Sequence, residues 1–197
     1  MKERIIQKGS GLFQVKGFTQ TSIQDIVEEL GVTKGTFYYY FTSKEELLME
    51  INDRYINDVL EKQYAIIENP ETDARTKIKE IITMLIKNID KQGANAKIFF
   101  RELNNLNEKH LKIIVAKRKE FYLNLQKVIE EGIKSGELRS DLRPDIVTFG
   151  ILGICNWSYH WFDPQGELSD VQVAHIFADM VLNGLELKTP DKLILEE

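Results

Sequence analysis

Cysteine is almost absent from this 197-residue chain, because Cys155 is the only one, and a single thiol excludes an internal disulfide. The three histidines and one cysteine form no cluster with the spacing of a metal site. Apolar runs fall far short of the roughly 20 residues that span a membrane. The opening stretch MKERIIQKG lacks the apolar core of a signal peptide. We therefore expect a cytoplasmic protein with no membrane partner, no metal and no cofactor.

The chain has no excess of positive charge of the kind that nonspecific nucleic-acid-binding proteins carry. The net charge is −5, with 29% charged and 43% hydrophobic residues, as in ordinary globular proteins. Residues 1–47 carry six Lys/Arg and six Asp/Glu, so the net negative charge comes from the other 150 residues. A small neutral region on an acidic body is compatible with site-specific binding by a dimer, not with indiscriminate binding.

The segment 21–44, TSIQDIVEELGVTKGTFYYYFTSK, has the pattern of two short helices joined by a tight turn. Thr21 and Ser22 supply a helix start, and Gly31 ends that helix because it can adopt positive φ. Thr33 is suited to cap the next helix. The first helix has an apolar stripe at helical spacing: Ile23, Ile26, Val27 and Leu30. This pattern predicts a helix-turn-helix, whose second helix enters the major groove of DNA.

The second helix has the surface that DNA binding requires. No Asp or Glu occurs from residue 31 to 43, where an acid would face phosphates. Hydroxyls and cations there can reach phosphates or base edges, and Gly35 would let the backbone approach closely. Lys44 beside a helix N-terminus is a candidate phosphate grip. The expected DNA-binding residues are Thr21, Ser22, Thr33, Lys34, Gly35, Thr36, Tyr38, Tyr39 and Lys44.

At these residues the chain resembles the DNA-binding domain of the TetR/AcrR family of bacterial transcriptional repressors. The resemblance covers roughly residues 2–50, and includes Gly17-Phe18 and the run GVTKGTFYYYFTSKEELL. One departure is Gly9-Ser10-Gly11, where the family more often has alanines. Each glycine costs a helix interior about 1 kcal/mol, so this first helix is expected to be soft.

The rest of the chain is helical in pattern, and no strand-like alternation occurs. We expect an all-α fold of about nine helices, three in a helix-turn-helix domain (1–46) and six in a ligand-binding and dimerisation domain (47–190). A loose tail is expected at 191–197. The body helices are expected at about 44–68, 72–91, 98–103, 108–134, 144–161 and 169–187, with an interruption at Gly93 and a turn at 104–107.

The resemblance implies a homodimer in which the last two long helices pair with their copies. Gly150 and Gly153 are three residues apart, which permits close helix approach, and the final helix is too apolar to be exposed. The expected interface residues are Gly150, Gly153, Ala174, Ala178, Val181 and Leu182. The alternative is that these side chains are buried inside one subunit.

The resemblance also implies a pocket for a small hydrophobic effector in the body. The candidate ligand-binding residues are Met84, Phe99, Phe100, Arg101, Phe121, Trp157, His160 and Trp161, although such an aromatic cluster can equally be core. FFREL, IEEGIKSGEL and the NW…W run are similar to repressors of fatty-acid and steroid degradation, which respond to acyl-CoA. In that case Arg101 could meet the phosphates. The rival is a multidrug-efflux repressor that stacks aromatic or cationic compounds on Trp157 and Trp161.

The resulting hypothesis is a dimeric, ligand-responsive repressor that is released from a two-fold double-stranded operator by its effector. We expect no enzyme and no catalytic residues, because no nucleophile–base motif or phosphate-binding loop is present. A helical protein-interaction module without DNA binding is the other alternative. The sign of regulation, the operator and the effector are left open by the sequence.

Overall fold

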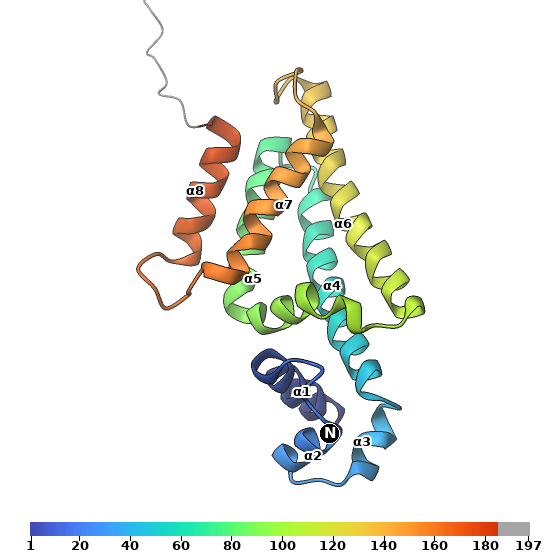
Figure 1. Ribbon diagram of the computed structural model, residues 1–197. Helices are drawn as coiled ribbons and strands as arrows, with labels where there is room; N and C mark the ends of the chain where they lie inside the picture. The colour runs from blue at the N-terminus through green and yellow to red at the C-terminus, as the bar shows by residue number, and fades with distance from the viewer. Residues whose placement is uncertain (185–197) are drawn as a thin grey trace, which may run out of the picture.

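The computed structural model describes residues 1–184, and over that range the protein is all-helical, as expected (Figure 1). The expected tail at 191–197 and residues 185–190 of the expected second domain lie outside the described residues. The described elements are α1 (Lys2–Lys16), α2 (Ile23–Leu30), α3 (Lys34–Tyr40), α4 (Lys44–Ile67), α5 (Ala74–Arg101), a 3-10 turn η1 (Leu103–Asn105), α6 (Glu108–Ser135), α7 (Pro144–Trp161) and α8 (Asp170–Asn183).

The three N-terminal helices form a small unit at one end of the molecule, and α4 runs from it into the larger bundle of α5–α8 (Figure 1). Within that bundle α5 contacts α4, α6, α7 and α8, and it also reaches α1. One continuous core links the two parts, from Phe13 and Phe37 through Leu47 to Ile82 and Phe99. The N-terminal unit is therefore held by the body through packing as well as through the chain.

Helix starts follow the signals in the sequence. The side chains of Ser22, Thr33, Ser43 and Ser169 each accept a hydrogen bond from the backbone N–H three residues on. Ser22 belongs to a full capping box, and its hydrogen bonds to Asp25 hold the pKa of that carboxyl at about 2.

The expected interruption at Gly93 is a bend within one helix, and not a break between two. Gln92 has φ −133° and ψ 16°, outside the helical region, and the helix then resumes as far as Arg101. The expected helices at 72–91 and 98–103 are therefore the two arms of α5. The second arm buries Ala96, Ile98 and Phe99, and this burial stabilises the helix after the bend. At the other end of the body α8 stops at Asn183, earlier than residue 187, with Gly184 at φ 75°.

The two glycines expected to soften α1 have different surroundings. A Cβ on Gly9 would lie 2.6 Å from Cδ2 of Leu47, which is fully buried, so Gly9 allows α1 to approach α4. A Cβ on Gly11 would meet no atom within 4 Å. Gly9 is therefore explained by packing, whereas nothing around Gly11 requires the absence of a side chain.

Substituting the two glycines should shift stability in opposite directions. We expect Gly11→Ala to raise the free energy of unfolding by about 1 kcal/mol through helix propensity. We expect Gly9→Ala to lower it by about 1–3 kcal/mol, because Leu47 must move within a packed core. Urea titrations followed by circular dichroism measure both values. If Gly9→Ala stabilised the protein as much as Gly11→Ala, the close α1–α4 packing would be wrong.

Candidate DNA-binding surface, cavity and apolar face

The α2–turn–α3 geometry is that of a helix-turn-helix. Gly31 ends α2 in the left-handed region, with φ 63° and ψ 36°, and its N–H donates to the carbonyl of Glu28 at 3.1 Å. The N–H of Val32 donates to the carbonyl of Val27 at 3.0 Å, which completes the turn. Phe37 and Phe41 are buried, with ring centroids 5.8 Å apart, and attach α3 to the core. The inward residues of α3 are therefore fixed, and its other side faces solvent.

The outward side of α3 contains most of the expected DNA-binding residues. Tyr39 is 81% exposed and Tyr38 is 53% exposed, although both are aromatic. Thr33, Lys34 and Gly35 are also exposed, and Thr36 is half-buried beside the cap. The structure thus brings these six residues to one surface that carries a cation, hydroxyls and no acid. Such a surface can contact phosphates and base edges.

Two expected contacts of this set need correction. Thr21 is buried, and its hydroxyl donates to the carbonyl of Gly17 at 2.8 Å, so its side chain fixes the loop before α2. Ser22 is exposed, but its hydroxyl is engaged by Asp25 in the capping box. The Thr21 hydroxyl therefore binds the preceding loop and the Ser22 hydroxyl caps α2, so neither is directed to a ligand.

Lys44 is the third correction. Its Nζ donates to the carbonyls of Phe18 and Thr21, each at 2.7 Å, and lies 4.3 Å from the centroid of the Phe18 ring. Desolvation lowers the pKa of this amine. Lys44 therefore ties the first turn of α4 to the loop between α1 and α2. This leaves Lys34 as the cation on the outward side of α3.

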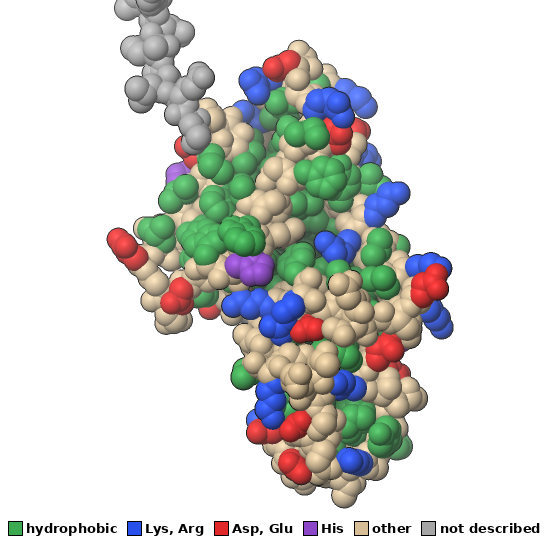
Figure 2. All heavy atoms as spheres, viewed as in Figure 1, with side chains coloured by type: hydrophobic (Ala, Val, Ile, Leu, Met, Phe, Trp, Pro, Cys, Tyr) green, Lys and Arg blue, Asp and Glu red, His purple; other side chains and the backbone are tan. Residues whose placement is uncertain are grey.

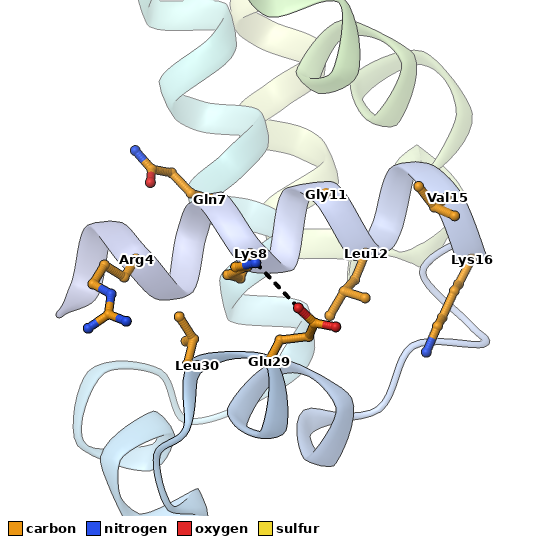
Figure 3. Close-up of a pocket in the computed structure, with 9 residues that line it drawn as sticks. All are labelled: Arg4, Gln7, Lys8, Gly11, Leu12, Val15, Lys16, Glu29 and Leu30. Atoms are coloured by element: carbon orange, nitrogen blue, oxygen red, sulfur yellow. Dashed lines mark hydrogen bonds and ion pairs between the residues drawn. The ribbon is translucent and has the colours of Figure 1, made fainter.

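A groove of about 570 Å³ lies between α1 and α2 (Figure 3). Its lining includes the charged side chains Arg4, Lys8, Lys16 and Glu29, and a hydrogen bond of 3.3 Å joins Lys8 to Glu29 across it. An apolar effector entering here would have to desolvate these charges. This groove is therefore poorly suited to an apolar ligand.

The body contains a second cavity, of about 580 Å³, between α4, α5, α6 and α7. Its wall is mostly apolar and aromatic, and contains two cations and no acid. The lining residues are Tyr55, Ile56, Val59, Leu85, Phe99, Phe100, Val115, Arg118, Lys119, Phe121, Tyr122, Phe149, Leu152, Gly153 and Asn156. A concave apolar site with a few polar groups is the usual form of a small-molecule site.

Only part of the expected ligand-binding set lines this cavity. Phe99, Phe100 and Phe121 are in its wall. The other five, which are Met84, Arg101, Trp157, His160 and Trp161, are not among the lining residues. On α6, sequence reasoning identified Phe121 but missed Val115, Arg118 and Lys119.

Arg101 points to the N-terminal unit and not to the cavity. Its guanidinium donates to the carbonyl of Phe13 at 2.6 Å and to Glu102 at 2.7 Å. On the same arm of α5, the carboxamide of Asn95 accepts a 2.5 Å hydrogen bond from Ser10. The arm that carries Phe99 and Phe100 in the cavity wall therefore also contacts α1.

An apolar face covers the outside of α7 and α8. Trp157 is 66% exposed and Trp161 is 50% exposed, and Gly150 and Gly153 lie exposed on the same helix. Figure 2 shows hydrophobic side chains gathered over this part of the body, with a histidine beside them. Further exposed apolar residues of this region are Ile146, Phe149, Leu168, Val171 and Ile176. A contiguous patch of this kind marks an interaction surface.

The expected interface residues divide between this face and the interior. Gly150 and Gly153 are exposed, and Val181 and Leu182 are half-buried. Ala174 and Ala178 are 1% and 2% exposed within a single chain, where α8 packs on α5. A partner therefore cannot reach these two alanines, and their assignment to the interface is corrected. Conversely, Trp157, His160 and Trp161 lie exposed on α7 and are reassigned to this face.

A helix-turn-helix joined by one long helix to a bundle with an apolar cavity is typical of one class, the helix-turn-helix regulators with a C-terminal ligand-binding domain. Residues 5–51 match the model of the bacterial regulatory proteins of the tetR family, and residues 71–185 match the tetracyclin repressor-like C-terminal domain. The chain belongs to the TetR family of transcriptional regulators.

Several relatives are distant in sequence but extend over nearly the whole chain. The transcriptional repressor KstR2 of Mycolicibacterium smegmatis is 25% identical over 193 residues, 97% of this chain and 93% of that protein. PfmR of Thermus thermophilus has a TM-score of 0.87 at 24% identity, over 93% of this chain and 100% of that chain. AibR, solved with isovaleryl coenzyme A and operator DNA, has a TM-score of 0.83 at 22% identity, over 92% and 97%. The two structural likenesses show a shared fold.

Within residues 1–184, no helix is both long and apolar enough to cross a bilayer.

Proposed function

We propose that this protein is a dimeric transcriptional repressor that binds a two-fold operator and is released by a small hydrophobic effector in the α4–α7 cavity. The observation that carries the proposal is the physical link between the two sites. Tyr55, Ile56 and Val59 of α4 line the cavity, and the same helix begins at Lys44, directly after α3. A ligand that moves this wall would therefore move α4, the helix to which α3 and its DNA-binding surface are joined.

On the DNA side, the proposal rests on the outward surface of α3. Thr33, Lys34, Gly35, Tyr38 and Tyr39 would enter the major groove, with Thr36 at the edge of the contact. A seven-residue helix reads only a few base pairs, so two copies on a two-fold site supply the affinity and the specificity. The relative AibR, solved with operator DNA, has the same fold.

For the dimer, we assign the apolar face of α7 and α8 as the isologous interface. Burying Trp157 and Trp161 against their copies would remove from water the largest exposed aromatic side chains of the body. The exposed glycines Gly150 and Gly153 would let two α7 helices approach closely. Val181 and Leu182 would contribute at the edge of the contact.

Two elements would couple effector binding in the cavity to the DNA-binding surface. One is α4 itself. The other is the second arm of α5, which presents Phe99 and Phe100 to the cavity and binds α1 through Asn95 and Arg101. Release requires the effector to bind better to the form that is off DNA, and the coupling is typically about 1–3 kcal/mol.

The effector we propose is an acyl-CoA thioester or a related compound whose apolar part would occupy the cavity. Support comes from the aromatic wall and from the relative AibR, which was solved with isovaleryl coenzyme A. A cationic drug stacked on Trp157 and Trp161 is disfavoured, because both side chains lie outside the cavity and its wall contains no acid.

Fluorescence anisotropy with a duplex from upstream of the protein's own gene tests the proposal. We expect tighter binding than to a shuffled duplex by about 1,000-fold or more. We expect an acyl-CoA effector to weaken operator binding by about 5- to 150-fold. Equal affinity for the two duplexes would contradict the proposed function, and sequence-specific binding that no acyl-CoA weakens would contradict the effector assignment alone.

A further inference from the structure

The cavity wall carries positive charge that the protein does not neutralise. Arg118 and Lys119 both line the cavity, and neither forms an ion pair with a side chain in the described part of the chain. On the same helix, Lys117 binds Asp53 and Lys112 binds Glu108. Arg118 and Lys119 differ from other unpaired surface cations because they lie in a mostly apolar wall that contains no acid.

Arg118 occupies the boundary between solvent and the apolar wall. The centre of its guanidinium lies 5.7 Å from the ring centroids of both Phe99 and Phe100. Desolvation lowers the pKa of Arg118, although arginine remains charged at neutral pH. The residue nevertheless keeps access to solvent. A cation that is partly desolvated and has no anionic partner attracts an anion.

We propose that the effector is an amphipathic anion, with its apolar part in the cavity and its anionic group held by Arg118, with Lys119 beside it. This inference rests on the proposed function only in treating the cavity as the effector site. A carboxylate or a phosphate at the rim would accept hydrogen bonds from the guanidinium, and Phe99 and Phe100 would contact the adjoining apolar part. Neutral and cationic compounds of the same shape would leave Arg118 without a counter-ion or repel it.

Two dyes of matched shape test the charge preference without DNA. The first is 8-anilinonaphthalene-1-sulfonate, an aromatic sulfonate, and the second is N-phenyl-1-naphthylamine, which has the same rings and no charge. Fluorescence titrations compare both dyes on wild type, Arg118→Met and Lys127→Met. Lys127 is the control, because it lies exposed on the same helix outside the cavity and its loss changes the net charge equally.

We expect Arg118→Met to weaken binding of the sulfonate by about 10- to 100-fold, the usual effect of losing a charge-assisted hydrogen bond. Binding of the neutral dye should stay within about twofold, which also shows that the variant is folded. Lys127→Met should match wild type with both dyes, apart from a small long-range effect. Equal loss of both dyes, or no loss of the sulfonate, would overturn the proposal.

Competition then distinguishes the source of the charge. Octanoate and octanoyl-CoA are each titrated against the bound sulfonate, with octylammonium as the cationic counterpart. Displacement by octanoate indicates a carboxylate, and displacement by octanoyl-CoA alone indicates phosphates. Either supports the proposal, whereas displacement by octylammonium at equal or lower concentration would overturn it. Because no DNA is present, failure here does not depend on whether the protein represses.

Discussion

Replacing Trp157 by glutamate is expected to convert the dimer into monomers and to weaken operator binding by about 100-fold or more, since central tryptophans contribute about 2–4 kcal/mol to interfaces. Trp157 is 66% exposed in the single chain and lies on α7 with Gly150, Gly153 and Trp161. Two carboxylates brought together in an apolar contact would lose solvation without gaining a partner. Sedimentation equilibrium measures the dimer, and anisotropy measures operator binding.

The control for this prediction is Val15→Glu, which makes a similar change on the N-terminal unit. Val15 is 83% exposed on α1, which belongs to the N-terminal unit, whereas α7 belongs to the body (Figure 1). We expect this variant to sediment as a dimer like wild type. A dimer that persists in Trp157→Glu at micromolar concentration would refute the assignment of this face. Dissociation of Val15→Glu as well would place the contact elsewhere.

The second large effect is expected at α3. Tyr39→Ala should weaken operator binding by about 100-fold, because a base contact contributes about 1–3 kcal/mol and occurs twice in the dimer. Binding to a shuffled duplex should change little. Tyr39 is 81% exposed, so its removal should leave the fold intact, and thermal unfolding checks this.

Lys34→Ala is the matched comparison on the same helix. As a phosphate contact, Lys34 should support binding to operator and shuffled duplex alike, and its loss should reduce the salt slope by about two per dimer. Anisotropy titrations over a range of salt concentrations separate the two roles. If Tyr39→Ala kept the full preference for operator, or if Lys34→Ala changed only that preference, the assigned roles would be wrong.

The helix-turn-helix could be predicted from the sequence because its signals are local. Ser22 and Thr33 cap helices that begin beside them, and Gly31 alone specifies the left-handed turn. The apolar spacing of α2 also identifies its buried side, where Ile26 and Val27 lie. The family resemblance extends over the same residues, so pattern and structure agree there.

The surroundings of Lys44, Ala174 and Ala178 could not be predicted, because they depend on contacts between distant parts of the chain. Lys44 was expected at phosphates, but the carbonyls that bind it come from a loop more than 20 residues away in sequence. Ala174 and Ala178 belong to a helix that is apolar on more than one side, so spacing could not tell the side facing α5 from the side facing solvent.

Arg118 gave no local signal at all. It lies between Lys117 and Lys119 in a charged stretch of α6, which in sequence resembles an ordinary solvated surface. Only the packing of α6 over Phe99 and Phe100 distinguishes it from its neighbours. The aromatic run on α7 was expected to bind the ligand, but its tryptophans lie outside the cavity. A high density of aromatic residues does not show whether they face a cavity or a partner.

Native mass spectrometry of the protein with a duplex from upstream of its own gene tests the central claim most directly. For a chain of 22.9 kDa, we expect two chains, or a multiple of two, per duplex, and free protein as a dimer. Octanoyl-CoA should appear bound to the dimer that has left the DNA. A single chain on the duplex, or effector bound to an undiminished DNA complex, would contradict the account.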